Sequence, residues 1–64
     1  MRIFVIMMEP EGMGAANLPV AFKTLEAARK EIARRDKTAE SVGDRMYRNP
    51  DYTYYYISEV EVQE

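Results

Sequence analysis

The segment at residues 3–8, IFVIMM, constrains the fold more than any other part of the sequence. It is apolar at every position and rich in β-branched residues, which predicts a strand at residues 2–8 with both faces buried. The rest of the sequence contains one segment with the periodicity of an amphipathic helix. A single helix can cover only one face of a sheet. We therefore expect one alternating set of side chains on this strand to lie on a face that the chain leaves uncovered, which is typical of an interface. The two sets are Ile3, Val5 and Met7, and Phe4, Ile6 and Met8.

The helix is predicted at residues 24–38. Thr24 is a favourable N-cap residue because its hydroxyl can accept a hydrogen bond from a free backbone N–H of the first turn. Leu25, Ala28 and Ile32 then follow with spacing i, i+3, i+7, which forms an apolar stripe that can pack on a sheet.

The last strand is predicted at residues 52–62, YTYYYISEVEV, where alternation assigns the side chains to two faces. One face carries Tyr52, Tyr54, Tyr56, Ser58, Val60 and Val62. The other face carries Thr53, Tyr55, Ile57, Glu59 and Glu61. Loops are predicted at residues 9–18 and 41–51, where Gly, Pro and Asn concentrate. Residues 19–22 predict a possible short strand, and Pro19 would place it at a sheet edge or limit its start.

These elements predict a single α+β domain, with one helix packed on a small, about three-stranded, mostly antiparallel sheet. A right-handed crossover would make the first and last strands parallel neighbours, whereas a hairpin strand between them would give an antiparallel or mixed sheet. We favour three strands because two strands and one helix barely make a core. A domain of about 60 residues buries only ~60% of the surface that its unfolded chain exposes, less than a larger domain does, so a partner or a second copy would stabilise it.

The composition argues against most catalytic chemistry. The sequence contains no Cys and no His, which excludes a disulfide framework and removes the commonest general base and metal ligand. Glu59 and Glu61 form a carboxylate pair roughly 7 Å apart on a strand, but nothing near them resembles a cation-binding loop. We therefore expect no enzyme, cofactor or metal. The apolar run at residues 3–8 is too short for a membrane span, so we expect a cytoplasmic protein with no membrane partner.

The net charge of −2 is unevenly distributed. Residues 23–48 carry eight basic and five acidic residues, whereas the rest of the chain carries one basic and six acidic residues. The six acidic residues outside this segment are a candidate partner-binding surface, because carboxylates can copy the row of negative charge on a nucleic acid. They are Glu9, Glu11, Asp51, Glu59, Glu61 and Glu64. The alternative for the last strand is a solvated edge protected by charge.

The five tyrosines all lie between Tyr47 and Tyr56. A tyrosine ring suits an interface because one end is apolar and the other end hydrogen-bonds to water. The candidate partner-binding aromatic residues are Tyr52, Tyr54, Tyr55 and Tyr56. The alternative interpretation is that the rings fill the core of a chain that is short of volume.

The predicted helix offers an alternative, phosphate-contacting surface. Its basic residues are Arg29, Lys30, Arg34, Arg35 and Lys37. Acidic residues interleave with them, which is typical of a solvated helix face. We therefore treat direct binding of nucleic acid as an alternative and not as the main activity.

Three segments together resemble small proteins encoded by phages and mobile elements. They are MRIFVIMMEPEG, AFKTLEAARKEIARR and YYYISEVEV. In such proteins an opening strand and an F-x-[ST]-x-E-x-A helix entry precede a closing strand similar to Y-x-I-x-E-x-E. Some of these proteins are anti-CRISPR proteins, which bind an effector complex and block its nucleic-acid site. The resemblance implies a non-catalytic inhibitor of a nucleic-acid-handling complex, with a host CRISPR effector subunit as its partner. A homodimeric interaction module is the alternative.

Overall fold

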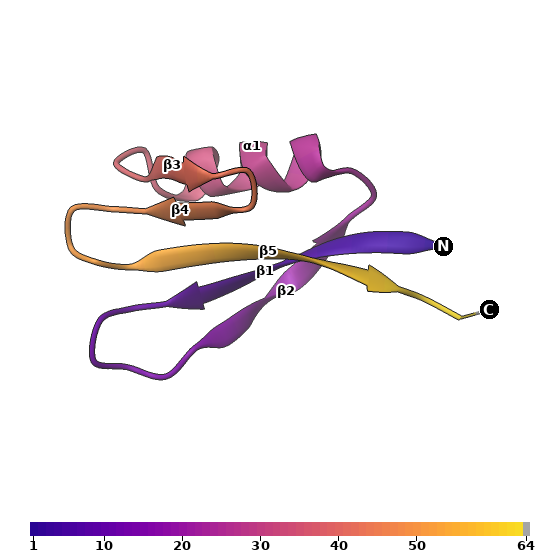
Figure 1. Ribbon diagram of the computed structural model, residues 1–64, viewed down its shortest axis with the longest axis horizontal. Helices are drawn as coiled ribbons and strands as arrows, with labels where there is room; N and C mark the ends of the chain where they lie inside the picture. Colours follow the sequence, from indigo (N-terminus) through magenta and orange to yellow (C-terminus); the bar gives the residue numbers. More distant parts are fainter. Residues whose placement is uncertain (64) are drawn as a thin grey trace.

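The computed structural model describes residues 1–63 and contains one helix and a five-stranded antiparallel sheet (Figure 1). The elements are β1 Arg2–Glu9, β2 Ala16–Phe22, α1 Leu25–Arg35, β3 Glu40–Gly43, β4 Met46–Arg48 and β5 Tyr54–Glu61. The strand order is β2-β1-β5-β4-β3, and the domain is mostly β. The predicted α+β domain with about three strands is therefore wrong.

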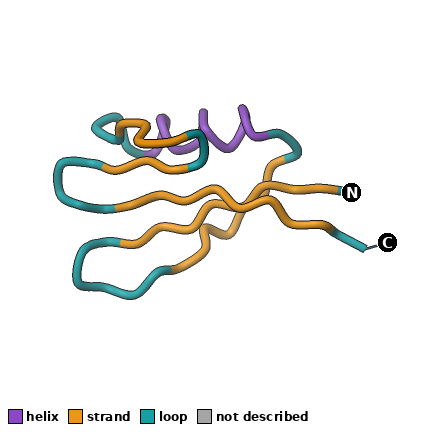
Figure 2. The backbone as a smooth tube through the Cα atoms, in the orientation of Figure 1, coloured by secondary structure: helices purple, strands orange, loops and turns teal. Residues whose placement is uncertain are grey.

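The two long strands, β1 and β5, are antiparallel neighbours in the middle of the sheet. Their register runs over eight residue pairs, from Arg2 opposite Glu61 to Glu9 opposite Tyr54. They are not parallel because the chain reaches β5 through β3 and β4, which form two successive hairpins after the helix. The β1–β2 and β4–β5 turns consequently lie at one end of the molecule and the chain termini at the other (Figure 2).

The strands β3 and β4 lie mostly within the predicted loop at residues 41–51. They are only four and three residues long, too short for alternation to stand out. The segment also contains Gly43, Asp44 and Asn49, which are typical of turns. Pairing with β5 makes β4 a strand, since Tyr47 lies opposite Tyr55.

The strand β2 is longer than the predicted residues 19–22 and shortens the preceding loop. Pro19 lies within it, and the predicted edge position is confirmed because β2 pairs only with β1. The register with β1 shifts between Val5 and Met7, so β2 departs from regular pairing near its proline. A proline is tolerated there because an edge strand need not donate every N–H to a neighbour.

The helix begins where the sequence indicates and ends earlier. The Thr24 hydroxyl accepts a hydrogen bond from the Ala27 N–H (N to Oγ1, 3.1 Å), which confirms the N-cap. The helix ends at Arg35, three residues before the predicted boundary. Asp36 caps it in an extended conformation and accepts hydrogen bonds from the backbone N–H and hydroxyl of Thr38, which turns the chain away from the helix axis.

The core lies between α1 and one face of the sheet. Its buried residues are Ile6, Ala28, Ile32, Tyr47, Tyr55 and Ile57. Ala28 and Ile32 confirm the predicted stripe of the helix, while Leu25 packs at its margin. On β1, Ile6 is fully buried with Phe4 and Met8 packed beside it. The alternating set Ile3, Val5 and Met7 therefore lies on the other face of the sheet.

Candidate protein-binding surface

The sheet face opposite α1 carries a row of apolar side chains, which we name the open face. Its residues are Ile3, Val5 and Met7 of β1, Met46 of β4, and Tyr54, Tyr56 and Val60 of β5. Val60 is 40% exposed, and the other six are half-buried by their strand neighbours. Within residues 1–63 the only helix packs on the opposite face, so this apolar surface remains open to solvent.

Two tyrosine rings of β5 stack on the open face. The rings of Tyr54 and Tyr56 stack with their centroids 6.1 Å apart and an angle of 13° between their planes. Met7 and Met46 flank Tyr56 on the neighbouring strands. The Tyr56 hydroxyl donates to Glu9 (Oη to Oε1, 3.4 Å), and burial together with this carboxylate raises the pKa of Tyr56. Tyr56 is thus tied to the end of β1, and Tyr54 stacks on it.

Two other tyrosines lie in the core under the helix. Tyr55, which was predicted to contact a partner, is only 6% exposed and donates its hydroxyl proton to Asp36 (Oη to Oδ2, 3.0 Å). Burial and this contact raise the pKa of Tyr55 to about 12. The hydroxyl of Tyr47 accepts from Arg29 (Nε to Oη, 2.8 Å). Both polar groups are satisfied, so these rings fill the core, as the alternative interpretation proposed.

Tyr52 occupies the β4–β5 turn in an unusual conformation. It has φ of 61° and is 53% exposed. The side-chain oxygen of Asn49 accepts hydrogen bonds from the backbone N–H groups of Asp51 and Thr53, both at 2.9 Å. The backbone carbonyl of Asn49 accepts a hydrogen bond from the Tyr52 N–H at 3.1 Å. This network holds the turn and presents the ring to solvent. The guanidinium of Arg48 lies 5.8 Å from the ring centroid.

The carboxylates at the end of β5 are paired within the chain. Glu59 lies 3.3 Å from an Arg2 nitrogen and 3.4 Å from an Arg45 nitrogen. Glu61 lies 3.4 Å from Arg2 and 3.5 Å from the N-terminal amine of Met1. These pairs neutralise most of the negative charge that the sequence places at this strand end.

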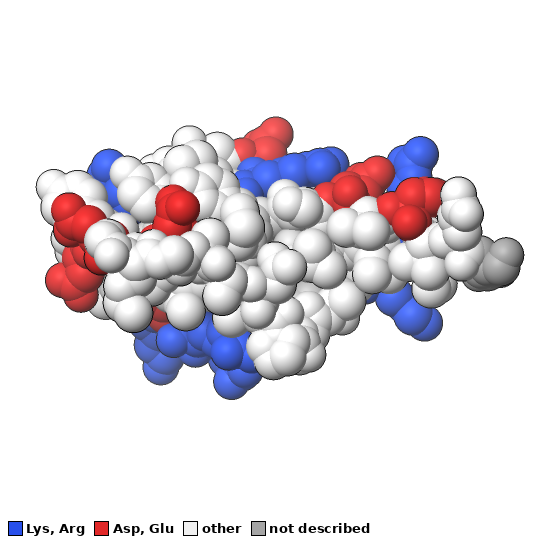
Figure 3. All heavy atoms as spheres, turned by 90° about the horizontal axis from the view of Figure 1, so that it is seen from below, with Lys and Arg blue, Asp and Glu red and all other residues white. Residues whose placement is uncertain are grey.

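The other predicted acidic residues lie at the opposite end of the molecule. Glu9 and Glu11 lie at the β1–β2 turn and Asp51 lies in the β4–β5 turn. Figure 3 shows acidic side chains gathered at this end and a broad stretch with few charged side chains between the two ends, as expected where residues 12–22 carry no charge. Glu64 lies outside the described residues. The structure therefore divides the predicted acidic surface between two ends of a molecule that is 39 Å long.

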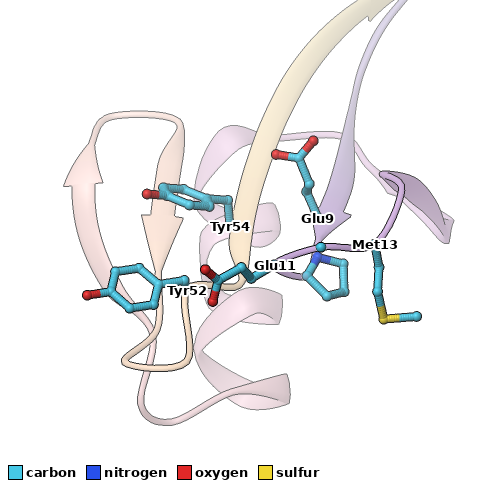
Figure 4. A pocket seen from close by; sticks show the side chains of 7 residues that line it. Glu9, Glu11, Met13, Tyr52 and Tyr54 are labelled. Carbon is cyan, nitrogen blue, oxygen red and sulfur yellow. The ribbon is translucent and has the colours of Figure 1, made fainter.

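A shallow depression of about 380 Å³ lies between the two turns (Figure 4). Its lining includes Glu9, Pro10, Glu11, Met13, Tyr52 and Tyr54. Gly12 also lines it and has φ of 75°, a conformation that glycine adopts without strain. The sequence marked the carboxylates and tyrosines as candidates but not Pro10, Gly12 and Met13, since a loop of unknown geometry gives no sign of what it faces. Met46 was missed on the open face because β4 was not predicted.

The basic residues of the helix are partly engaged within the chain. Arg34 and Arg35 both donate to the carboxylate of Glu31, and the hydrogen bond from Arg34 lowers the pKa of Glu31 to about 2. Arg29 binds the Tyr47 hydroxyl. Lys30 and Lys37 are exposed, but they lie among these pairs and not in a row of free cations. The arrangement is that of a solvated helix face.

The described part of the chain, residues 1–63, contains no group of three or more acidic side chains close enough to hold a metal ion. The eleven-residue helix is too short and too polar to cross a membrane. The chain matches no protein-family model, no curated protein and no solved structure. The resemblance to phage-encoded inhibitors therefore stays a prediction.

Proposed function

We propose that this protein is a non-catalytic module that binds another protein through its open face. The observation that carries this proposal is that one helix covers one side of the sheet and leaves seven apolar or aromatic side chains on the other side without cover. A contiguous apolar patch of this kind is uncommon on a monomer that has no partner.

The open face has the features of a binding hot spot. The rings of Tyr54 and Tyr56 are stacked, and the hydrogen bond from Tyr56 to Glu9 restricts the motion of the Tyr56 ring. Aromatic anchors that are already ordered lose little conformational entropy when a partner covers them. The methionines beside them can adjust to the shape of a partner because their side chains are unbranched.

The more specific prediction, an inhibitor that mimics nucleic acid, depended on a single acidic surface. Glu59 and Glu61 are paired with basic groups of the chain and lie far from Glu9 and Glu11. The proposal therefore covers protein binding in general and does not include a CRISPR effector as the partner. The compartment that we propose is the cytoplasm, since a chain without cysteine suits a reducing environment.

A homodimer is the second candidate, and the size of the core favours it. Only six residues are buried in the described chain. A core this small gives a single domain little stability, and a second copy packed on the open face would bury more apolar surface.

Substitutions on the two faces of the molecule test the proposal. Val60→Lys and Met7→Lys each place a charge on the open face. Ala33→Lys places the same charge on the exposed side of α1 and is the matched control. Lysine is tolerated at Val60 because that side chain is already 40% exposed. Each variant is compared by thermal unfolding, by sedimentation and by capture of proteins from a cell lysate with and without nuclease treatment.

We expect the native protein and Ala33→Lys to capture the same stoichiometric partner, and Val60→Lys and Met7→Lys to lose it while remaining folded. If the partner is a second copy, sedimentation shows a dimer that the two open-face substitutions dissociate. Equal capture by all variants, with monomers throughout, would contradict the proposal. Capture that depends on nuclease-sensitive material would point to the helix instead.

A further inference from the structure

We infer that the depression between the β1–β2 and β4–β5 turns is a binding site for an arginine side chain of a partner protein. This site is distinct from the apolar part of the open face, although Tyr54 borders both. Its existence does not depend on what covers the open face, and it can be tested alone.

The walls of the depression suit a planar cation. Figure 4 shows the rings of Tyr52 and Tyr54 on one side, Glu9 and Met13 on the other, and the carboxylate of Glu11 turned toward the tyrosine side. A guanidinium group is attracted to the face of an aromatic ring and packs on it with little loss of hydration. Tyr52 already makes such a contact within the chain, since the guanidinium of Arg48 lies 5.8 Å from its ring centroid. Within residues 1–63 no cation of the chain lies over the Tyr54 ring, which is therefore the ring available to an arginine of the partner.

The charge of the depression complements a cation. Glu9 and Glu11 line it, and Asp51 lies beside Tyr52 in the adjoining turn. Across residues 1–63 no ion pair joins Glu9 or Glu11 to a basic group, in contrast to Glu59 and Glu61 at the other end of the sheet. Glu9 accepts one hydrogen bond, from Tyr56, which leaves its other oxygen free for a second donor. Two carboxylates beside aromatic rings form an acceptor set for the paired N–H groups of arginine.

Lysine fits this site less well than arginine. Its ammonium is a compact, strongly hydrated charge that cannot stack as a plane on a ring. The depression is open to solvent, so a side chain carried by another protein can enter it. The conformation of Tyr52 agrees with a binding role, since an exposed ring is held at positive φ by the Asn49 network.

The test uses the intact protein and the tripeptide acetyl-Gly-Arg-Gly-amide, followed by the backbone amide signals of the ¹⁵N-labelled protein. Matched peptides carry lysine or citrulline in place of arginine; citrulline keeps the planar shape and removes the charge. We expect saturable shifts that are confined to residues 9–13 and 52–54, with a dissociation constant in the millimolar range, as for a single side-chain contact. Lysine should bind more weakly, and citrulline should not bind.

Two protein variants complete the test. Glu11→Gln removes one carboxylate from an exposed loop residue, which leaves the fold intact, and should weaken binding of the arginine peptide about tenfold. Glu26→Gln removes an exposed carboxylate of the helix and should leave binding unchanged. Equal binding of the citrulline peptide, equal affinity of the two variants, or shifts of similar size at Glu59 and Glu61 would overturn the inference.

Discussion

At the scale of single residues, Asp36 connects three parts of the chain. Its carboxylate accepts from Tyr55 of β5, from Asn49 of the β4–β5 turn (Nδ2 to Oδ2, 2.8 Å) and from Thr38 after the helix. The hydrogen bonds from Thr38 and Asn49 lower the pKa of Asp36 to about 2. The residue that ends the helix therefore also fixes the turn that carries Tyr52.

Replacing this carboxylate should make the domain less stable in a pH-dependent way. We expect Asp36→Asn to lower the free energy of unfolding at pH 7 by about 2 kcal/mol, since charge-assisted hydrogen bonds are lost. Because the pKa of Asp36 is about 2 when folded and its ordinary value is 3.8, its contribution is present above pH 4 and is lost as the pH falls toward 2. Urea unfolding across this range should show the difference between the two proteins shrinking, while a constant difference would exclude this origin. Glu31→Gln is the comparison, since the pKa of Glu31 is also lowered to about 2 but its hydrogen bonds come only from Arg34 and Arg35 of the helix.

Tyr52 should show opposite effects on stability and on binding. Asparagine tolerates positive φ better than tyrosine does, so Tyr52→Asn should relieve backbone strain. The free energy gained by relieving this strain exceeds the free energy of the lost cation–π contact with Arg48, because that contact lies at an exposed site. We therefore expect a net stabilisation of about 0.5 kcal/mol. The same substitution removes one wall of the depression and should weaken binding of the arginine tripeptide. A less stable variant would show that the Tyr52 ring contributes to packing. Unchanged binding of the tripeptide would show that the ring is not part of the binding site.

At the scale of elements, strand alternation was the most reliable guide. It correctly separated Tyr55 and Ile57 from Tyr54 and Tyr56, because a period of two depends only on local backbone geometry. Strand alternation could not show which face the helix covers. Tyr55 was chosen as a partner-binding residue because the covered face was not known. The strands β3 and β4 were missed because they are only four and three residues long and lie among residues that are typical of turns. The hairpin-end depression could not be predicted because it joins two turns that are about 40 residues apart in sequence.

The acidic end of β5 should act in stability and not in partner binding. Glu59 is paired with Arg2 and Arg45, so Glu59→Gln should lower the free energy of unfolding by about 0.5 kcal/mol, the usual scale for exposed ion pairs. The loss should diminish in 1 M salt, where such pairs are screened. Capture of the partner should be unchanged. Lost capture with unchanged stability would return this strand end to the binding surface.

At the scale of the whole molecule, the fold separates two kinds of surface. The helix side holds the core and the ion pairs, whereas the open face is apolar and ends at an acidic, tyrosine-lined depression. The sequence predicted an uncovered apolar face from one segment at residues 3–8. Tyr54 and Tyr56 of β5 were also predicted to face a partner, whereas the part of this face that β4 contributes, with Met46 opposite Tyr56, was not predicted.

The most direct measurement of whether the open face is the docking face is site-specific photo-cross-linking in living cells. The photoreactive residue p-benzoylphenylalanine replaces Val60 in one variant and Ala33 in the other, so that one probe lies on the open face and one on the helix. We expect a discrete covalent adduct from position 60, either to one partner protein or to a second copy, and none from position 33. An adduct from position 33 alone, or no adduct from position 60, would contradict this expectation.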